Sequence, residues 1–106
     1  MTALNWDTDS AGYLTDPGSW QPRFAIQTAE SEGIVLTADH WQVIDFLRDY
    51  YARFGISPPM RALVKAIGPL LGEAKASSRR LYQLFPDGPA KQACKIAGLP
   101  KPDSCI

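Results

Sequence analysis

The sequence predicts a mainly α-helical protein: a small bundle of crossed helices with a short N-terminal β-hairpin and a flexible C-terminal arm. Apolar residues recur at steps of three and four over residues 41–54, and a second repeat of this kind follows over residues 60–67. Glycines and prolines separate the periodic segments, as is common at helix ends. A chain of 106 residues with 45% hydrophobic and 21% charged residues fits a single globular domain.

The N-terminal part predicts two elements. Residues 4–20 alternate loosely between polar and apolar, and the turn formers of residues 16–19 interrupt them, which indicates a short hairpin or extended pair. Small and apolar residues spaced three or four apart then predict a helix over residues 19–31. Ser19 is its expected N-cap and Gly33 its stop.

The strongest pattern predicts the central core helix, which follows the N-cap Thr37 and ends at Gly55. Its apolar positions are Trp41, Ile44, Leu47, Tyr51 and Phe54. Ser57-Pro58 predicts the start of a second helix, and Gly68-Pro69 its end. The apolar face of this second helix consists of Met60, Leu63, Val64 and Ile67. The short turn between the two helices makes them a helix-turn-helix-like pair.

Two short helices are expected in the C-terminal half. Ser77 or Ser78 is the expected cap of the first, whose apolar residues are Leu81, Leu84 and Phe85. The second starts at Pro89 and is closed by Gly98. No helix signal follows, so we expect one helical domain over residues 1–98 and a mobile arm over residues 99–106.

The composition excludes several kinds of protein. No run of eighteen apolar residues is present, and the first residues lack the basic and apolar regions of a signal peptide. We therefore expect a cytoplasmic protein without direct membrane binding. A zinc site built from the two cysteines and one histidine would be short of ligands or would need carboxylates, so no metal is expected, and no cofactor either. The histidine, His40, is expected to cap a helix or lie at the surface.

The two halves of the chain differ in charge although the net charge is zero. Residues 1–60 carry three arginines against eight acidic residues, and residues 61–106 carry eight basic residues against three acidic ones. Such asymmetry is compatible with an acidic protein partner, an anionic substrate or a nucleic acid, and it does not choose among them.

The only two cysteines, Cys94 and Cys105, are the main indication of chemistry. Cys105 is the penultimate residue, and Gly98, Pro100 and Pro102 discourage a helix between the two thiols. An extended arm from Gly98 would carry Cys105 about 20 Å. Bent back, the same arm would close a loop without severe strain. A reducing cytosol disfavours a permanent disulfide, so the pair predicts reversible thiol chemistry.

The charges near the thiols favour this interpretation modestly. Lys91, Lys95 and Lys101 place positive charge near the cysteines, which favours the thiolate. The terminal carboxylate acts in the opposite direction on Cys105. Cys94 alone fits a packing role equally well, whereas the pair favours reactivity.

Two other interpretations remain open. The helix-turn-helix pattern with nearby basic residues, Arg61, Lys65, Arg79 and Arg80, is compatible with a nucleic-acid-binding regulator. Against it, the second helix presents core-like residues and the net charge is zero. Alternatively, a Cys94–Cys105 disulfide would act as a stabilising staple for the tail.

Aromatic residues are expected to pack in the core and hairpin rather than stack bases: Trp20, Trp41, Tyr50, Tyr51 and Tyr82.

The C-terminal residues resemble a known family. The run from Leu84-Phe85-Pro86 to Cys94-Lys95-Ile96-Ala97-Gly98-Leu99-Pro100-Lys101-Pro102, with Cys105 penultimate, is similar to the DsrC/TusE family, also called the gamma subunit of dissimilatory sulfite reductase. Other segments that carry the resemblance are Asp9 to Leu14, Glu32-Gly33-Ile34, Leu36-Thr37, His40-Trp41 and Phe46 to Tyr51. Together they cover nearly the whole chain.

The resemblance implies a small helical sulfur carrier, a protein co-substrate more than an enzyme; classed as an enzyme, it would be a sulfurtransferase. Cys105 would take up sulfur as a persulfide or enter the reductase's active-site channel. Cys94 would then join it in a disulfide or trisulfide. The implied partners are dissimilatory sulfite reductase, sulfur donors of the DsrEFH or TusBCD type, and a heterodisulfide-reductase-like complex.

The resemblance also leaves one alternative. TusE members lack the upstream cysteine and pass sulfur toward tRNA thiolation, so the presence of Cys94 points to the DsrC branch. A TusE-like relay with a tRNA-thiolating enzyme as partner stays the alternative. Asp103-Ser104 departs from the small neutral pair of many relatives. The negative charge of Asp103 would weaken docking of Cys105 into an anion-binding channel, so it favours the carrier role over the reductase role.

Overall fold

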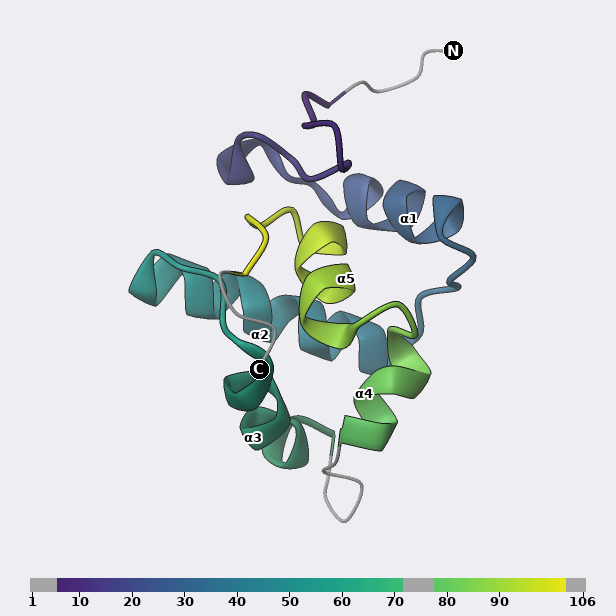
Figure 1. Cartoon of the computed structure of the whole chain (residues 1–106), viewed down its shortest axis with the longest axis vertical. Coiled ribbons are helices and arrows are strands. Elements are labelled where there is room, and N and C mark those ends of the chain that lie inside the picture. Colours follow the sequence, from purple (N-terminus) through teal and green to yellow (C-terminus); the bar gives the residue numbers. More distant parts are fainter. Residues whose placement is uncertain (1–5, 72–77, 103–106) are drawn as a thin grey trace.

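The computed structural model describes residues 6–71 and 78–102, and in these ranges the chain forms one 3-10 helix and five α-helices (Figure 1). They are η1 (Pro17–Ser19), α1 (Pro22–Ser31), α2 (Ala38–Phe54), α3 (Met60–Leu71), α4 (Ser78–Leu84) and α5 (Pro89–Ile96). The prediction of a mainly helical bundle is confirmed. None of the helices in the described ranges is long and apolar enough to cross a membrane.

The helix at the centre of the fold is α5, and the prediction that α2 holds this place is wrong. α5 contacts each of the other four α-helices (Figure 1). Six of its residues are buried: Pro89, Ala90, Gln92, Ala93, Cys94 and Ile96. Small alanine side chains let neighbouring helices approach α5 from several sides. α2 is longer but buries only one face, and Phe54 at its end is 62% exposed.

The predicted N-terminal hairpin is reduced to a single antiparallel bridge between Thr8 and Leu14. The Asp9 carboxylate accepts hydrogen bonds from two amides of the intervening turn, which fixes the turn without a ladder. Directly after the bridge, Pro17 begins η1, and proline has no amide proton for strand pairing. No strand therefore forms in the described residues before α1.

The first α-helix begins later than the predicted cap, Ser19, implies. Pro22 occupies the first helical position, and the residue before it, Gln21, is extended at φ −138° and ψ 157°, as a residue before proline prefers. Ser19 instead ends η1, where its hydroxyl donates to the Asp16 carbonyl at 2.8 Å. The predicted end at Ser31 is confirmed.

The predicted bounds of α2 are confirmed. Thr37 is the N-cap, and Gly55 ends the helix in the left-handed region at φ 72°. His40 completes a capping box, because its Nδ1 accepts the Thr37 amide proton at 3.0 Å. The expectation of a capping histidine is therefore confirmed, and that of a surface position is wrong. His40 is only 6% exposed, and its Nε2 lies 2.8 Å from the Leu84 carbonyl.

The third helix differs from the prediction at both ends. It begins at Met60, where the amides of Ala62 and Leu63 bond the Pro59 carbonyl, and the predicted cap, Ser57, instead donates its hydroxyl to the Pro100 carbonyl at 2.6 Å. It also continues past Gly68-Pro69 to Leu71. Proline in the last turn removes one helical hydrogen bond, but the extra turn lets Leu71 pack against the core.

The core is formed where α5 meets its neighbours. Its fully buried large side chains include Ile44, Leu47, Leu63, Ile67, Leu81, Phe85, Ile96 and Leu99. Burying a side chain of this size contributes about 1.5–3 kcal/mol. The short helix α4 is confirmed, with its apolar residues in this core; the alternative cap Ser77 lies outside the described residues.

Stability should fall at acid pH because of His40. Burial has the largest effect and lowers the pKa of this imidazole below 6.5; the bond to Leu84 and the Asp39 charge raise it, and the Arg80 charge lowers it. The unfolded chain therefore takes up a proton that the folded chain refuses. This stability is present above about pH 6.5 and is lost as the pH falls through the folded pKa.

Urea unfolding of the wild type and of His40→Gln checks this expectation. Glutamine at this position can keep the capping box but does not titrate. At neutral pH the variant should be less stable by about 1–3 kcal/mol, the cost of a lost buried hydrogen bond. The gap should narrow toward pH 5. A wild type that loses no more stability than the variant over this range contradicts the assignment.

Candidate functional site

Cys94 lies on the inner face of α5. It follows Ala90 by one helical turn and precedes Ala97 by less than one, so all three face the core. Its exposed fraction is 0%, and it is a free cysteine among the described residues. The side chain therefore occupies a packing position as well as carrying a thiol.

Burial controls the acidity of this thiol. It raises the pKa of Cys94 from 9.0 to about 12, and a hydrogen bond with the Ser57 side chain offsets part of the effect. An apolar surrounding disfavours the charged thiolate because it cannot solvate the charge. In this conformation Cys94 is a protonated thiol at neutral pH, and it needs uncovering before it can act as a nucleophile.

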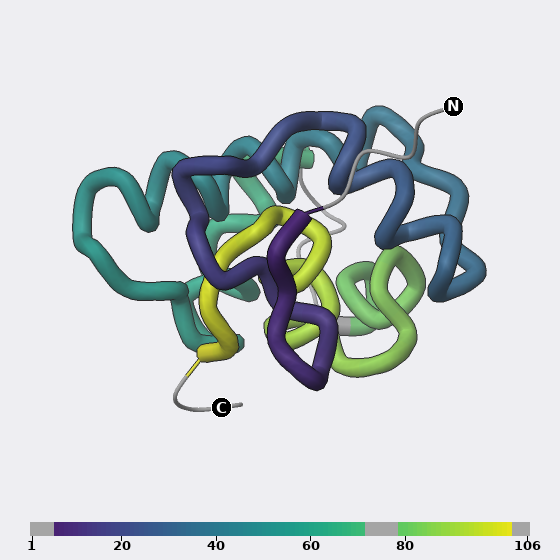
Figure 2. The backbone as a smooth tube through the Cα atoms, turned by 90° about the horizontal axis from the view of Figure 1, so that it is seen from above, coloured from purple at the N-terminus to yellow at the C-terminus, as the bar shows by residue number. Residues whose placement is uncertain are grey.

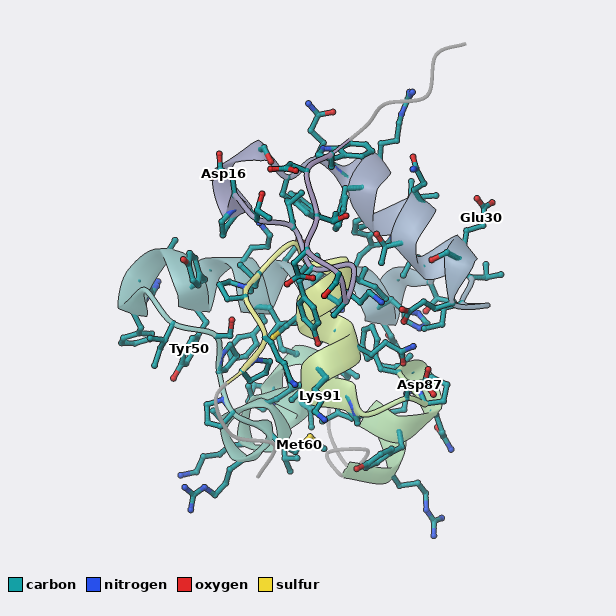
Figure 3. All side chains as sticks on the ribbon, turned by 45° about the horizontal axis from the view of Figure 1, so that its top comes forward. Asp16, Glu30, Tyr50, Met60, Asp87 and Lys91 are labelled. Atoms are coloured by element: carbon teal, nitrogen blue, oxygen red, sulfur yellow. The ribbon has the colours of Figure 1, made fainter. Side chains whose placement is uncertain are left out.

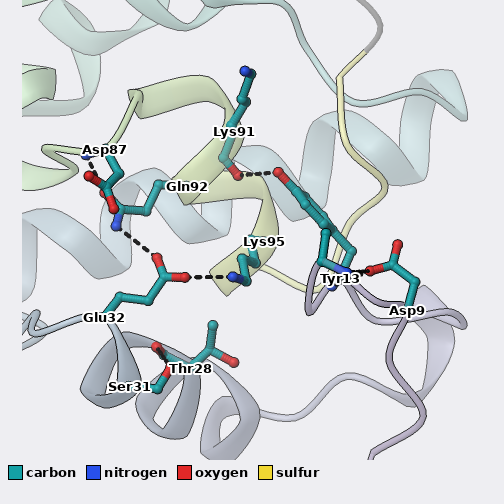
Figure 4. A network of polar contacts seen from close by, with 10 residues as sticks. Asp9, Tyr13, Thr28, Ser31, Glu32, Asp87, Lys91, Gln92 and Lys95 are labelled. Atoms are coloured by element: carbon teal, nitrogen blue, oxygen red, sulfur yellow. Dashed lines mark hydrogen bonds and ion pairs between the residues drawn. The ribbon is translucent and has the colours of Figure 1, made fainter.

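Lys95, the lysine nearest to Cys94 in sequence, forms an ion pair with a carboxylate rather than with the thiol. The Lys95 ammonium bonds Glu32 Oε2 at 2.6 Å (Figure 4). Gln92 donates to the other carboxylate oxygen at 2.8 Å and accepts the Asp87 amide proton at 3.0 Å. Although burial alone raises the pKa of Glu32, these bonds hold it below 4.5. The network ties α5 to the end of α1 and compensates the Lys95 charge.

The other two candidate lysines line a surface cavity. Lys91 and Lys101, together with Tyr13 and the Glu32–Lys95 pair, border a cavity of about 290 Å³. The Lys91 carbonyl accepts the Tyr13 hydroxyl proton at 3.3 Å, while its side chain points away from the Glu32 network (Figure 4). Within the described residues, neither Lys91 nor Lys101 forms an ion pair.

A second cavity, of about 190 Å³, lies beside the first. Lys91 also lines this one, with Met60 and Tyr82 on its other walls, and Figure 3 shows Lys91 and Met60 on the same face of the molecule. Asp87 lines both cavities, so this face combines the ammonium groups of Lys91 and Lys101 with one carboxylate next to α5.

The chain reverses direction directly after α5. Gly98 adopts φ 74°, and the next amide, that of Leu99, donates back to the Cys94 carbonyl at 2.9 Å. Leu99 is fully buried and Pro102 is buried as well. The part of the arm that the structure describes, Leu99–Pro102, thus packs on the domain beside the α2–α3 connection (Figure 2).

Cys105 lies outside the described residues, so the mobile arm and the role of this thiol stay predictions. Of the residues predicted to support the site, Gly98 forms the turn after α5, and Lys95 forms an ion pair with Glu32. Pro100 receives the Ser57 hydroxyl bond, and Pro102 is buried. No group of three His, Cys, Asp or Glu side chains suited to a metal ion occurs in the described part of the chain.

Sequence reasoning missed three residues at this site. Ser57, assigned as a helix cap, lies between Cys94 and the arm. Trp20 bonds the carbonyl of Ile96, the last residue of α5, and Arg48 bonds that of Ala97, its C-cap. Of these three residues, only Arg48 could have been noticed in the sequence, because it is a charged residue between the apolar Leu47 and Tyr51 of a periodic helix.

The whole chain, residues 1–106, matches the family model described as DsrC like protein. The sulfurtransferase TusE of Escherichia coli strain K12 is 54% identical over 100 residues, which cover 94% of this chain and 92% of TusE.

Solved structures agree with this match. DsrC from Allochromatium vinosum aligns with a TM-score of 0.85 and 48% identity, covering 93% of this chain and 88% of that one. The oxidized gamma-subunit of the dissimilatory sulfite reductase (DsrC) from Archaeoglobus fulgidus aligns with a TM-score of 0.85 and 40% identity, covering 95% and 92%. Sequence and fold together show that this chain belongs to the DsrC family.

Proposed function

We propose that the protein is a sulfur carrier in which Cys105 accepts sulfur and Cys94 resolves the adduct. The observation that carries the proposal is the match to the DsrC family over residues 1–106. The position of Cys94 supports it, because this thiol lies within one helical turn of the Gly98 turn from which the arm departs. The carrier acts as a co-substrate of its partners.

The first step is thiol exchange at Cys105. Its thiolate attacks the outer sulfur of a donor persulfide, so a new sulfur–sulfur bond forms on Cys105 and the donor leaves as a thiolate. Electrons balance without an external oxidant, because the sulfane sulfur only changes its partner.

The second step uses Cys94. When Cys105 holds a partner or a substrate through a disulfide, the Cys94 thiolate attacks the Cys105 sulfur and expels the other sulfur as a thiolate. Attack on a Cys105 persulfide would likewise release hydrosulfide. Both reactions form the Cys94–Cys105 disulfide. Because burial keeps Cys94 protonated, this step follows a local opening of the structure.

Two destinations of the sulfur are supported by different relatives. The gamma-subunit of dissimilatory sulfite reductase supports a partnership with that reductase. The 54% identity to a sulfurtransferase TusE supports a relay role at least equally, with tRNA thiolation as its end. The second cysteine, Cys94, favours the first. Lys91 and Lys101, which line the same cavity, suit acidic groups on a donor or acceptor in either case.

Mass spectrometry of the intact protein after incubation with a persulfide donor tests the carrier role. The wild type should gain one sulfur, and Cys105→Ala should gain none. Cys94→Ala is the matched control, because it removes a thiol but should still gain sulfur. Sulfur uptake by Cys105→Ala at the wild-type rate would refute the assignment of Cys105.

The same variants separate the two destinations. A TusE-like relay needs one thiol, so Cys94→Ala should pass its sulfur to an acceptor thiol as fast as the wild type. A role that ends in the Cys94–Cys105 disulfide needs both thiols. In that case Cys94→Ala should remain attached to its partner as a mixed disulfide, which non-reducing electrophoresis detects.

The buried thiol should also make stability fall at alkaline pH. The pKa of Cys94 is raised from 9.0 to about 12, so the folded chain keeps a proton that the unfolded chain releases in this window. The free energy of unfolding should therefore fall by up to about 1.4 kcal/mol per pH unit above pH 9.

Comparison of Cys105→Ala with Cys94→Ala/Cys105→Ala isolates this effect, since lysines and tyrosines titrate equally in both. Urea unfolding at about pH 8 and about pH 10.5 should show a steeper alkaline loss when Cys94 is present. Equal losses in the two variants would show that the thiol is not held in its protonated form.

A further inference from the structure

Two side chains far from Cys94 in sequence bond the carboxyl end of α5. Trp20 Nε1 donates to the Ile96 carbonyl at 3.0 Å, and Arg48 Nη1 donates to the Ala97 carbonyl at 2.9 Å. The last carbonyls of a helix have no partner within the helix and need one when they are partly buried. The indole and the guanidinium supply it.

The two side chains also contact each other. The Arg48 guanidinium carbon lies 4.5 Å from the Trp20 ring centroid, which is a cation–π contact. The second guanidinium nitrogen, Nη2, donates to the Pro17 carbonyl at 3.1 Å. We refer to Trp20 and Arg48 as the clamp. It joins η1, α2 and the end of α5 at one point.

The clamp lies directly against the turn from which the arm departs. A Cβ atom added to Gly98 would lie 2.3 Å from Trp20 Cδ1, a distance that no side chain can accept. Gly98 also has a positive φ of 74°. The indole ring therefore covers Gly98, and the chain leaves the turn along a fixed path.

This path leads back beside Cys94. The Leu99 amide donates to the Cys94 carbonyl at 2.9 Å, and the Leu99 side chain is fully buried in the same core as Cys94. The Ser57 hydroxyl donates to the Pro100 carbonyl at 2.6 Å, and the Ser57 side chain also hydrogen-bonds the Cys94 thiol. Residues 98–100 thus help to close the space around this thiol.

We propose that the clamp holds the first residues of the arm folded over Cys94, and that its release admits reactants to this thiol. Trp20 and Arg48 are positioning residues, because they act through the backbone of α5 and the arm. The proposal deepens the proposed function by giving the event that activates Cys94. Shielding of a thiol is measurable without sulfur transfer, so failure of one proposal is distinguishable from failure of the other.

The test measures alkylation of Cys94 by N-ethylmaleimide in Cys105→Ala, where only one thiol can react. Into this background we place Trp20→Phe, which removes the indole donor, and Arg48→Lys, which keeps the charge but not the planar pair of donors. Arg53→Lys is the matched control, because Arg53 lies on the same helix in an exposed ion pair with Asp49.

Each clamp variant should react about tenfold faster or more, the effect of losing one charged or buried hydrogen bond. At low urea concentrations, the rate of Cys94 alkylation should change little with added urea, because local opening exposes little surface. The Arg53→Lys control should react at the parent rate. Unchanged rates in the clamp variants would overturn the proposal. So would rates that rise only with the steep urea dependence of global unfolding.

Amide hydrogen exchange in Cys105→Ala with an intact clamp provides a second measurement that needs no clamp variant. The Leu99 amide, bonded to Cys94, should exchange through the same opening that exposes the thiol. The opening constants from exchange and from alkylation should then agree. If Cys94 reacts while the Leu99 amide exchanges only by global unfolding, the arm does not cover the thiol and the proposal is wrong.

Discussion

The enclosure of α5 by the other four helices is the interaction on which the rest of the structure depends. Alanines at positions 90, 93 and 97 allow this close approach, and the buried Gln92 is satisfied by the Asp87 amide and the Glu32 carboxylate. A buried polar group without such partners would be costly. Cys94 is part of this core, so the thiol chemistry that we propose for it is coupled to packing.

In the proposed function, this coupling gives the two cysteines different roles. The burial that stabilises α5 also keeps Cys94 protonated, whereas the penultimate Cys105 follows the last described buried residue, Pro102, by three positions. Three fully extended residues span at most about 10 Å, which is the limit for a chain that starts at a fixed Pro102. Release of the arm back to Gly98 extends the reach to about 20 Å. In the proposal made above, release of Leu99–Pro102 would therefore both lengthen the reach of Cys105 and expose Cys94.

Much of the fold was predictable from local signals. Capping residues and glycines gave the bounds of α2 and α5, because these signals act within one turn of chain. The central place of α5 was not predictable, since it depends on which helices meet in space. Ser57 and Ser19 look like N-caps in sequence, but tertiary hydrogen bonds and Pro22 decide otherwise. The Trp20–Arg48 contact joins residues too far apart in sequence for any local pattern to reveal.

The most direct test of the division between the thiols is competitive alkylation of the fully reduced wild type, followed by peptide mapping. With a limiting amount of reagent at neutral pH, Cys105 should be modified first and Cys94 should stay unmodified until denaturant is added. Modification of Cys94 at an equal or greater rate in the folded protein would contradict the account, because it would mean that the thiol on α5 is neither covered nor held in its protonated form.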